Sequence, residues 1–126
     1  MKIPLNLLYT NDHEWLRIEK DIAYIGITDF AQSELGDIVY VEIETVGDTL
    51  NQNDVFGSVE AVKTVSDLFL PIHGEVLELN SKLESSPELV NEDPYGEGWI
   101  IKLKIDANAD LEGLLNAEAY ARLIGS

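Results

Sequence analysis

One lysine stands apart from the other cations of this sequence, and its isolation raises the question of covalent chemistry. Lys63 is the only cation between Lys20 and Lys82, and Glu60 and Asp67 are its near neighbours. An accessible lysine can be acylated by another enzyme, and its flexible stem then becomes part of a longer arm. Lipoamide and biotin are group carriers of this kind. Isolated lysines are more often ordinary surface residues, so the surroundings must decide between the two interpretations.

Other patterns of catalytic or metal-binding residues are weak. His13 and His73 are the only histidines, and their separation matches no metal-ligand spacing. The absence of cysteine excludes disulfides, thiol nucleophiles and cysteine-based zinc sites. Two acidic pairs are better interpreted as a solvated acidic face than as general acids and bases: Glu84/Glu88 and Glu92/Asp93. We therefore assign no catalytic residue and no metal ligand.

The charge balance restricts the partners of the chain. Twenty-four acidic residues face eight basic ones, which gives a formal net charge of −16. Nucleic acids and anionic membranes repel such a surface, because phosphate binding needs clustered Lys and Arg. The charge indicates either solubility alone or attraction toward basic partner proteins. No apolar run approaches the roughly 20 residues of a membrane span. The first residues resemble neither a signal nor a transit peptide, so a cytoplasmic location is the simplest expectation.

Short apolar and β-branched runs predict a mainly β protein. The first two runs, 13–18 and 22–27, are separated by a charged turn and predict a hairpin. Further strands are expected at residues 37–43, 55–62, 65–72, 75–79 and 99–105. Pro71 has no N–H and must therefore lie at a sheet edge or a bulge.

Three segments have helix signals. Residues 28–36 predict a short helix, capped by Thr28 or Asp29 and ended by Gly36 in the left-handed conformation. Ser86 followed by Pro87 is typical of a helix start. Residues 108–124 predict one or two C-terminal helices, with Asn116 as a cap and Gly125 as a stop.

These elements predict an antiparallel sandwich or flattened barrel with small helices at its margins, because no long alternation of strands and helices is present. We expect one domain over residues 1–126, with a core at about 9–105 and C-terminal helices at about 108–124. Gly47 and Gly74 each open a similar apolar run on either side of Lys63. Two such units meeting at a loop would place Lys63 at a protruding tip. Residues 62–65 contain no Gly, Asn or Pro, however, and by themselves predict continuous strand.

Several motifs, in order, resemble the H-protein family of the glycine cleavage system. The segment around the lysine, GSVEAVKTVSD at residues 57–67 with 71–76 after it, is similar to the family's lipoylation segment. The similarity continues over nearly the whole chain, at residues 13–15, 26–32, 35–42 and 91–99. Ordered motifs over about residues 9–123 are far more specific than a lone Glu-x-x-Lys.

The resemblance implies a lipoyl/biotinyl-carrier-like hammerhead of two antiparallel sheets, with Lys63 on a hairpin. It implies a lipoate joined to Lys63 through an amide, and a carrier role rather than an enzyme. In that role the chain passes an aminomethyl group from glycine decarboxylase (the P protein) to an aminomethyltransferase (the T protein). Dihydrolipoamide dehydrogenase (the L protein) then reoxidises the carrier, and a lipoate ligase or a lipoyl/octanoyl transferase attaches the cofactor. We expect a monomer, since transient partners need a free surface.

The same resemblance implies roles for four further residues. Glu60 and Gly74 match positions that shape the hairpin for the lipoate-attaching enzyme. Glu14 and Asp67 match acidic positions near the cleft where the loaded arm docks, and a carboxylate there could pair with the aminomethyl cation.

The main departures from the family pattern are Asp12, Thr64 and His73, where Ser or Thr, Ala and Ser are commoner. These departures affect the docking details and leave Lys63 itself untouched.

Three alternatives remain open from the sequence. A lipoyl donor or relay carrier for other lipoate-dependent enzymes would have much the same motif around Lys63. A biotin carrier is disfavoured, because the lysine does not lie between two methionines. An unmodified interaction module or a hydrolase would follow if Lys63 never carried a group.

Overall fold

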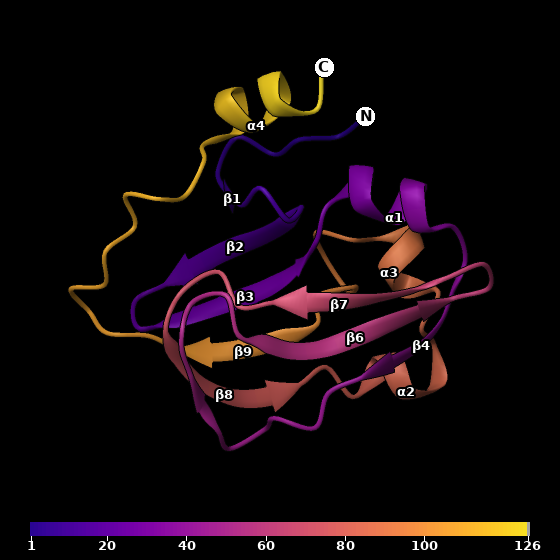
Figure 1. Cartoon of the computed structure of the whole chain (residues 1–126), viewed down its shortest axis with the longest axis horizontal. Helices are drawn as coiled ribbons and strands as arrows, with labels where there is room; N and C mark the ends of the chain where they lie inside the picture. Colours follow the sequence, from indigo (N-terminus) through magenta and orange to yellow (C-terminus); the bar gives the residue numbers. More distant parts are fainter. Residues whose placement is uncertain (126) are drawn as a thin grey trace.

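Alternating strand patterns build two antiparallel sheets in the computed structural model, which describes residues 1–125 (Figure 1). The larger sheet has six strands in the order β1 (Leu8–Tyr9), β2 (Glu14–Glu19), β3 (Ile22–Ile27), β9 (Ile101–Lys104), β8 (Gly74–Leu79) and β5 (Thr49–Leu50). The smaller sheet has three strands in the order β4 (Ile38–Glu42), β6 (Val55–Ala61) and β7 (Val65–Phe69). The predicted fold class, mainly β with two antiparallel sheets and short helices, is confirmed.

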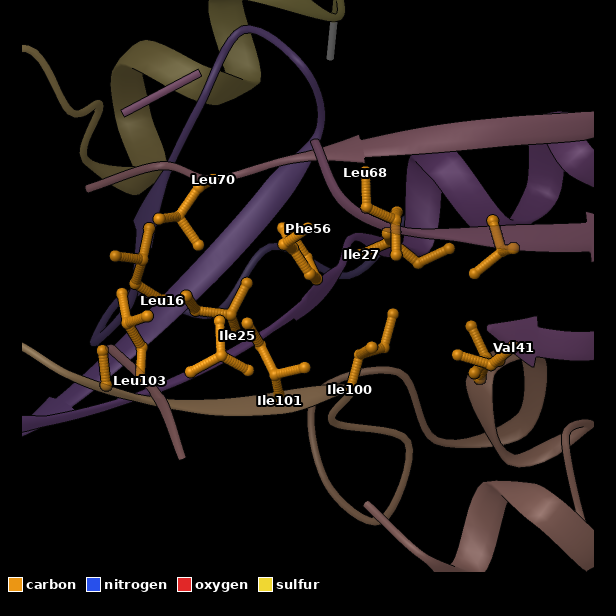
Figure 2. Packing of buried hydrophobic residues seen from close by; sticks show 14 of the residues in the cluster. Leu16, Ile25, Ile27, Val41, Phe56, Leu68, Leu70, Ile100, Ile101 and Leu103 are labelled. Atoms are coloured by element: carbon orange, nitrogen blue, oxygen red, sulfur yellow. The ribbon is translucent and has the colours of Figure 1, made fainter. Parts of the chain in front are cut away.

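The hydrophobic core lies between the two sheets (Figure 2). Leu16, Ile25 and Leu103 fill it from the larger sheet, and Phe56 and Leu68 from the smaller one. Their burial follows from the strand period of two, which turns every second side chain toward the opposite sheet. Removing this apolar area from water at about 25 cal/mol per Å² is what holds the two layers together.

A second, aromatic cluster joins the two ends of the chain. Tyr9 on β1 stacks on Tyr120 of helix α4 (Ala117–Leu123), with 4.7 Å between the ring centroids. The Tyr120 hydroxyl lies 2.7 Å from Thr28 Oγ1 and 2.9 Å from His13 Nδ1. Buried Trp15 donates its indole N–H to the carbonyl of Pro94 at 3.0 Å. Each buried polar tip in this cluster thus has a hydrogen-bond partner, as burial requires.

Helix caps follow the sequence signals at two of the predicted helices. Helix α1 (Asp29–Leu35) begins after Thr28, whose side chain accepts a hydrogen bond from Ala31 N. Helix α4 begins after Asn116, whose side chain accepts from Ala119 N. Gly36 ends α1 with φ 82° and ψ −160°, so it does not adopt the predicted left-handed helical conformation. It occupies another positive-φ region that is essentially restricted to glycine.

The predicted C-terminal helices at 108–124 are wrong over their first half. Only residues 117–123 of this segment are helical; turns lie at 107–108 and 112–113, and Leu115 forms an antiparallel bridge with Tyr9. Asp110 Oδ1 accepts from the backbone N–H of Glu112 at 2.9 Å. Such local side-chain bonds compete with helix formation and favour turns.

Strand β1 was not predicted, and the other differences lie at the ends of strands and in the 80–99 segment. The strand predicted over 65–72 ends at Phe69, and Pro71 lies outside the sheets, as its missing N–H requires. The last strand begins at Ile101 rather than at residue 99. Two single-turn helices flank the predicted helix start at Ser86, namely α2 (Lys82–Ser85) and α3 (Leu89–Glu92).

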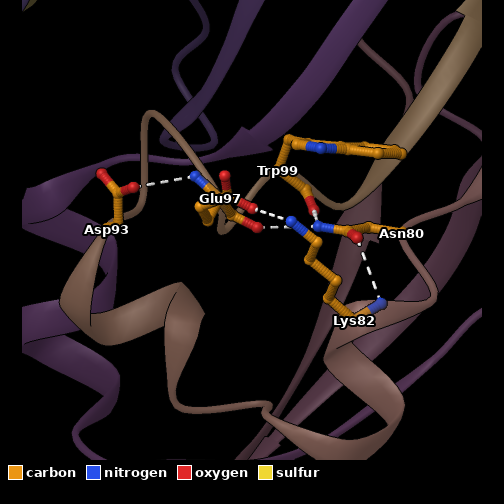
Figure 3. Close-up of polar contacts among 5 residues, drawn as sticks. All are labelled: Asn80, Lys82, Asp93, Glu97 and Trp99. Carbon is orange, nitrogen blue, oxygen red and sulfur yellow. Dashed lines mark hydrogen bonds and ion pairs between the residues drawn. The ribbon is translucent and has the colours of Figure 1, made fainter.

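A buried asparagine fixes the loop that leads into β9 (Figure 3). The Asn80 amide donates to the carbonyls of Glu97 and Trp99, each at 2.8 Å, and its oxygen accepts from Lys82 N at 3.2 Å. Asp93 accepts from the Glu97 N–H at 2.9 Å, and the Lys82 ammonium pairs with the Glu97 carboxylate. The irregular backbone between α3 and β9 therefore has defined partners.

Candidate functional site

Lys63 lies at the turn between β6 and β7, at the tip of a hairpin. Ala61 N donates to Thr64 O at 2.7 Å, so Val62 and Lys63 form a two-residue loop. Among residues 1–125 the non-glycine residues with positive φ are His13, Lys20 and Asn53, so neither loop residue needs a glycine-like conformation. The usual Gly or Asn signal of a hairpin is therefore missing from the sequence. Both side chains are exposed, and Figure 1 shows the hairpin extending past the neighbouring strands.

The segment between α1 and β4 supports this tip. Val62 N donates to Asp37 O at 3.0 Å, and Ile38 pairs with Ala61. The stem of Lys63 passes over Gly36, where a Cβ atom would lie 3.5 Å from Lys63 Cε and 4.0 Å from Nζ. The end of the Lys63 side chain thus lies beside the backbone of Gly36, at van der Waals distance from where a Cβ would be.

Asn91 on α3 holds that supporting segment in place. Its amide nitrogen donates to Gly36 O at 2.9 Å and to Gln32 Oε1 at 3.0 Å. Its oxygen accepts from the backbone N–H of Ile38 at 2.9 Å. An asparagine side chain offers two N–H donors and two acceptor positions on its oxygen, and these contacts use three of the four. The sequence carried no signal for this role beyond the position of Asn91 inside the family-like segment 91–99.

The surroundings of Lys63 are acidic, but none of the ion pairs among residues 1–125 involves its amine. Glu60 is exposed on β6 and lies between Tyr40 and Val65 in the sheet register. The structure therefore brings Glu60 close to the hairpin tip. An exposed amine without a fixed carboxylate partner is available for acylation.

Gly74 lies away from the tip, at the start of β8. It pairs with Leu50 of β5, and a Cβ atom there would collide with the carbonyl oxygen of Lys104 on β9. The two glycine-led runs noted in the sequence, near Gly47 and Gly74, thus meet through the β5–β8 pair. In this pair and in the β6–β7 pair, one strand precedes the Lys63 loop in the sequence and the other follows it.

Glu14 is a buried acid with few polar contacts. Only 1 % of the residue is exposed, and its carboxylate accepts from Phe69 N at 2.7 Å. Burial raises the pKa of Glu14 to about 8, against the opposing effect of the Phe69 hydrogen bond. Burial thus favours the protonated form of the Glu14 carboxyl group. It borders a cavity of about 220 Å³ that is also lined by Thr10, Asp12 and Asn53.

Asp67 borders a different cavity. It is exposed on β7 and lines a recess of about 240 Å³ together with Glu42 and Glu44. The structure therefore does not bring Glu14 and Asp67 into one cavity. Their predicted common role in docking the arm stays a prediction.

Neither a metal cluster nor a membrane-crossing helix occurs within residues 1–125. No group of three or more His, Asp or Glu side chains there is placed to hold a metal ion. No helix in that range is long and apolar enough to span a bilayer.

Comparisons with known proteins agree on one family. The family profile described as "Glycine cleavage H-protein" matches residues 7–126. A protein named glycine cleavage system H protein from Bacteroides thetaiotaomicron is 62% identical over 125 residues, covering 98% of each chain. A protein of the same name from Bacteroides fragilis is 59% identical over 126 residues and covers all of both chains. The crystal structure of a glycine cleavage system H protein from Mycobacterium marinum has a TM-score of 0.89 at 38% identity, covering 98% of this chain and 100% of that one.

Proposed function

Because this chain belongs to the glycine cleavage H-protein family, we propose that it is a lipoyl carrier with its cofactor joined to Lys63. The single observation that supports this most is the position of Lys63. Its amine is exposed at the tip of a two-residue loop, and it is the only cation of the three-stranded sheet and its turns. The site fits a covalent lipoyl group, because Lys63 is exposed and none of the ion pairs among residues 1–125 involves its amine.

In this proposal Lys63 Nζ attacks the carbonyl carbon of an activated lipoyl group. A carbon–nitrogen amide bond forms, the activating group leaves, and the amine gives up a proton. The lysine charge is lost, so the arm can move between partners without a fixed cation. When attached, the lipoyl group supplies the sulfur chemistry that carries an aminomethyl group and is later reoxidised. The chain itself supplies accessibility, orientation and shielding, and acts as a carrier subunit rather than a catalyst.

The partners in the proposal follow from the family name. They are the glycine decarboxylase P protein, the aminomethyltransferase T protein, the dihydrolipoamide dehydrogenase L protein, and a lipoate ligase or lipoyl/octanoyl transferase. We propose that the carrier acts as a cytoplasmic monomer. Glu60 is proposed to help the attaching enzyme recognise the hairpin, because it lies on the strand that leads to Lys63.

We also propose that Glu14 takes part when the arm carries a cationic group. A cation near a buried carboxyl favours its ionised form, so Glu14 would lose its proton as the cation arrives. Asp67 would act from the separate recess that it lines. If Glu14→Gln left the lifetime of the loaded carrier unchanged, this docking role would be wrong.

The test of the carrier function is an intact mass with peptide mapping, after incubation with lipoate and a lipoate ligase. One lipoyl amide on Lys63 is expected, and Lys63→Arg should carry none. Lys20→Arg is the matched control, because Lys20 is another exposed lysine in a hairpin turn, between β2 and β3; it should be modified like the wild type. No added mass, with a ligase that modifies a known acceptor, would overturn the proposal.

A further inference from the structure

We propose that the outer face of the three-stranded sheet is the docking surface for the enzyme that acylates Lys63. This surface, called here the hairpin face, consists of Tyr40, Glu42, Glu60, Val65 and Asp67. The enzyme is expected to present basic side chains around an apolar centre. The inference rests on the proposed function, because it requires that Lys63 be acylated.

Strand register aligns the first row of the hairpin face. Tyr40 pairs with Glu60, and Glu60 pairs with Val65, so these three residues lie side by side across β4, β6 and β7. Residues directly opposite in antiparallel strands share one face of the sheet. Tyr40 is 52% exposed and Val65 is 62% exposed. This row lies next to the loop of Val62 and Lys63.

The apolar side chains of this row are exposed rather than packed in the core. Leu68 and Val59 of the same sheet point into the core and are buried, whereas Tyr40 and Val65 face away from it. Val62 at the tip is 76% exposed and extends the apolar surface to the lysine itself. Tyrosine is enriched among the residues that dominate binding energy at protein interfaces.

The second row of the hairpin face is acidic and defines the charge of the partner. Glu42 pairs with Ser58, and Ser58 pairs with Asp67, two residues further from the tip. Glu42 and Asp67 also line the recess of about 240 Å³ that includes Glu44. Six acids occur between residues 38 and 69, and Lys63 is the one base in that range: Glu42, Glu44, Asp48, Asp54, Glu60 and Asp67. Complementary charge accelerates association and fixes the orientation of the partner.

The acylating enzyme is the occupant that the geometry favours over later partners. An unmodified lysine extends only the length of its own stem, so the enzyme must bring its active site to the hairpin tip. Later partners receive a longer arm and can bind further away. Acylation also removes the only cation of this sheet, so the product differs from the substrate at the docking surface itself. Another acidic part of the surface, the recess lined by Asp106, Asp110 and Glu112, contains no residue of the hairpin that carries Lys63.

The experiment measures kcat/KM for acylation by a lipoate ligase, with the full chain as acceptor. Tyr40→Ser and Val65→Ser remove the apolar row. Leu77→Ser is the matched control, since Leu77 is an exposed apolar residue on β8 of the other sheet. Thermal unfolding of each variant establishes that it is folded at the assay temperature.

Each hairpin-face variant is expected to lower kcat/KM by on the order of tenfold, as the loss of an interface anchor does. Leu77→Ser should stay within about twofold of the wild type, since isolated surface changes have small effects. Wild-type rates for a folded Tyr40→Ser/Val65→Ser double variant would overturn the inference. Normal acylation combined with impaired use of the loaded arm by other enzymes would also overturn it, because the occupant would then be a later partner.

A second pair of variants tests the charge of the occupant. Glu42→Gln/Asp67→Asn should lower kcat/KM at low salt and weaken its dependence on salt concentration. Glu75→Gln/Asp106→Asn changes the same number of exposed acids elsewhere and should leave the salt dependence unchanged. Equal salt dependence of the two double variants would contradict a basic partner. A wild-type chain that is never acylated would instead reject the carrier function itself.

Discussion

Glu14 on β2 accepts a hydrogen bond from the backbone N–H of Phe69 on β7, with 2.7 Å between oxygen and nitrogen. The two residues are 55 positions apart, and the bond joins the larger sheet to the smaller one. Phe69 is the last residue of the strand that follows the Lys63 loop. A buried acid thus connects the hairpin that contains Lys63 to the larger sheet, and its protonation should affect stability.

Glu14 should make the protein less stable as the pH rises. The folded chain holds this proton up to a pKa of about 8, whereas an unperturbed glutamate has a pKa of 4.5. The contribution of this proton to the free energy of unfolding is therefore fully present below pH 4.5 and is lost as the pH rises to about 8. Each pKa unit corresponds to about 1.4 kcal/mol, so the loss amounts to a few kcal/mol at most.

The measurement is the free energy of unfolding from pH 5 to 9 for the wild type and Glu14→Gln. The glutamine can still accept from Phe69 N and carries no titrating proton, so its stability should fall less over this range. Glu75→Gln, at an exposed position on β8, should keep the wild-type slope. Parallel curves for the wild type and Glu14→Gln would contradict the assignment of the buried acid.

Gly74 should be required for stability, whatever part it has in recognition. A Cβ atom at this position would collide with the Lys104 carbonyl and with the Leu103 side chain. We expect Gly74→Ala to cost about 1–3 kcal/mol, as overpacking does. Gly113→Ala is the control, since an added Cβ meets nothing within 4 Å there. Chemical denaturation measures both, and equal stabilities of the two variants would rule out the packing explanation.

Gly36 should resist substitution for a conformational reason. Its φ of 82° and ψ of −160° lie in a region essentially restricted to glycine. Gly36→Ala is expected to lose about 1–3 kcal/mol of unfolding free energy. Gly125, which also has a positive φ of 76°, provides a comparison, and Gly125→Ala should cost less because an added Cβ there meets nothing within 4 Å. A fully stable Gly36→Ala variant would show that the segment can relax around a side chain.

Asn91 should control the order of the Lys63 hairpin from a distance. Asn91→Ala removes two hydrogen bonds to the segment that supports the tip and one to Gln32 on α1, and we expect a loss of about 2–3 kcal/mol. Val62 N donates to Asp37 O in that segment, so exchange of the Val62 amide with deuterium should become faster. Asn116→Ala removes only the cap of α4 and should leave this amide unchanged. Unchanged Val62 exchange in Asn91→Ala would mean that the hairpin is ordered without the asparagine.

Local patterns in the sequence were sufficient for much of the fold. The hairpin of β2 and β3 follows from two alternating runs and a charged turn, and the caps Thr28 and Asn116 follow from side chains that satisfy the nearest free N–H groups. These features depend on interactions within a few residues. The isolation of Lys63 among acids and the family motifs around it were likewise visible in the sequence alone.

Tertiary structure alone decided the features that depend on distant residues. The Val62–Lys63 turn has no sequence signal, because it needs no positive φ and is held by Asp37 from another segment. The contacts of Asn91 join residues 53 to 59 positions apart, and the burial of Glu14 depends on a strand far along the chain. The cavity beside Glu14 likewise combines residues from distant parts of the chain, namely 10–12, 14, 52–53, 70–71 and 113–114. Sequence determines which side chains are available, whereas packing between distant strands determines which of them meet and how strongly water is excluded around them.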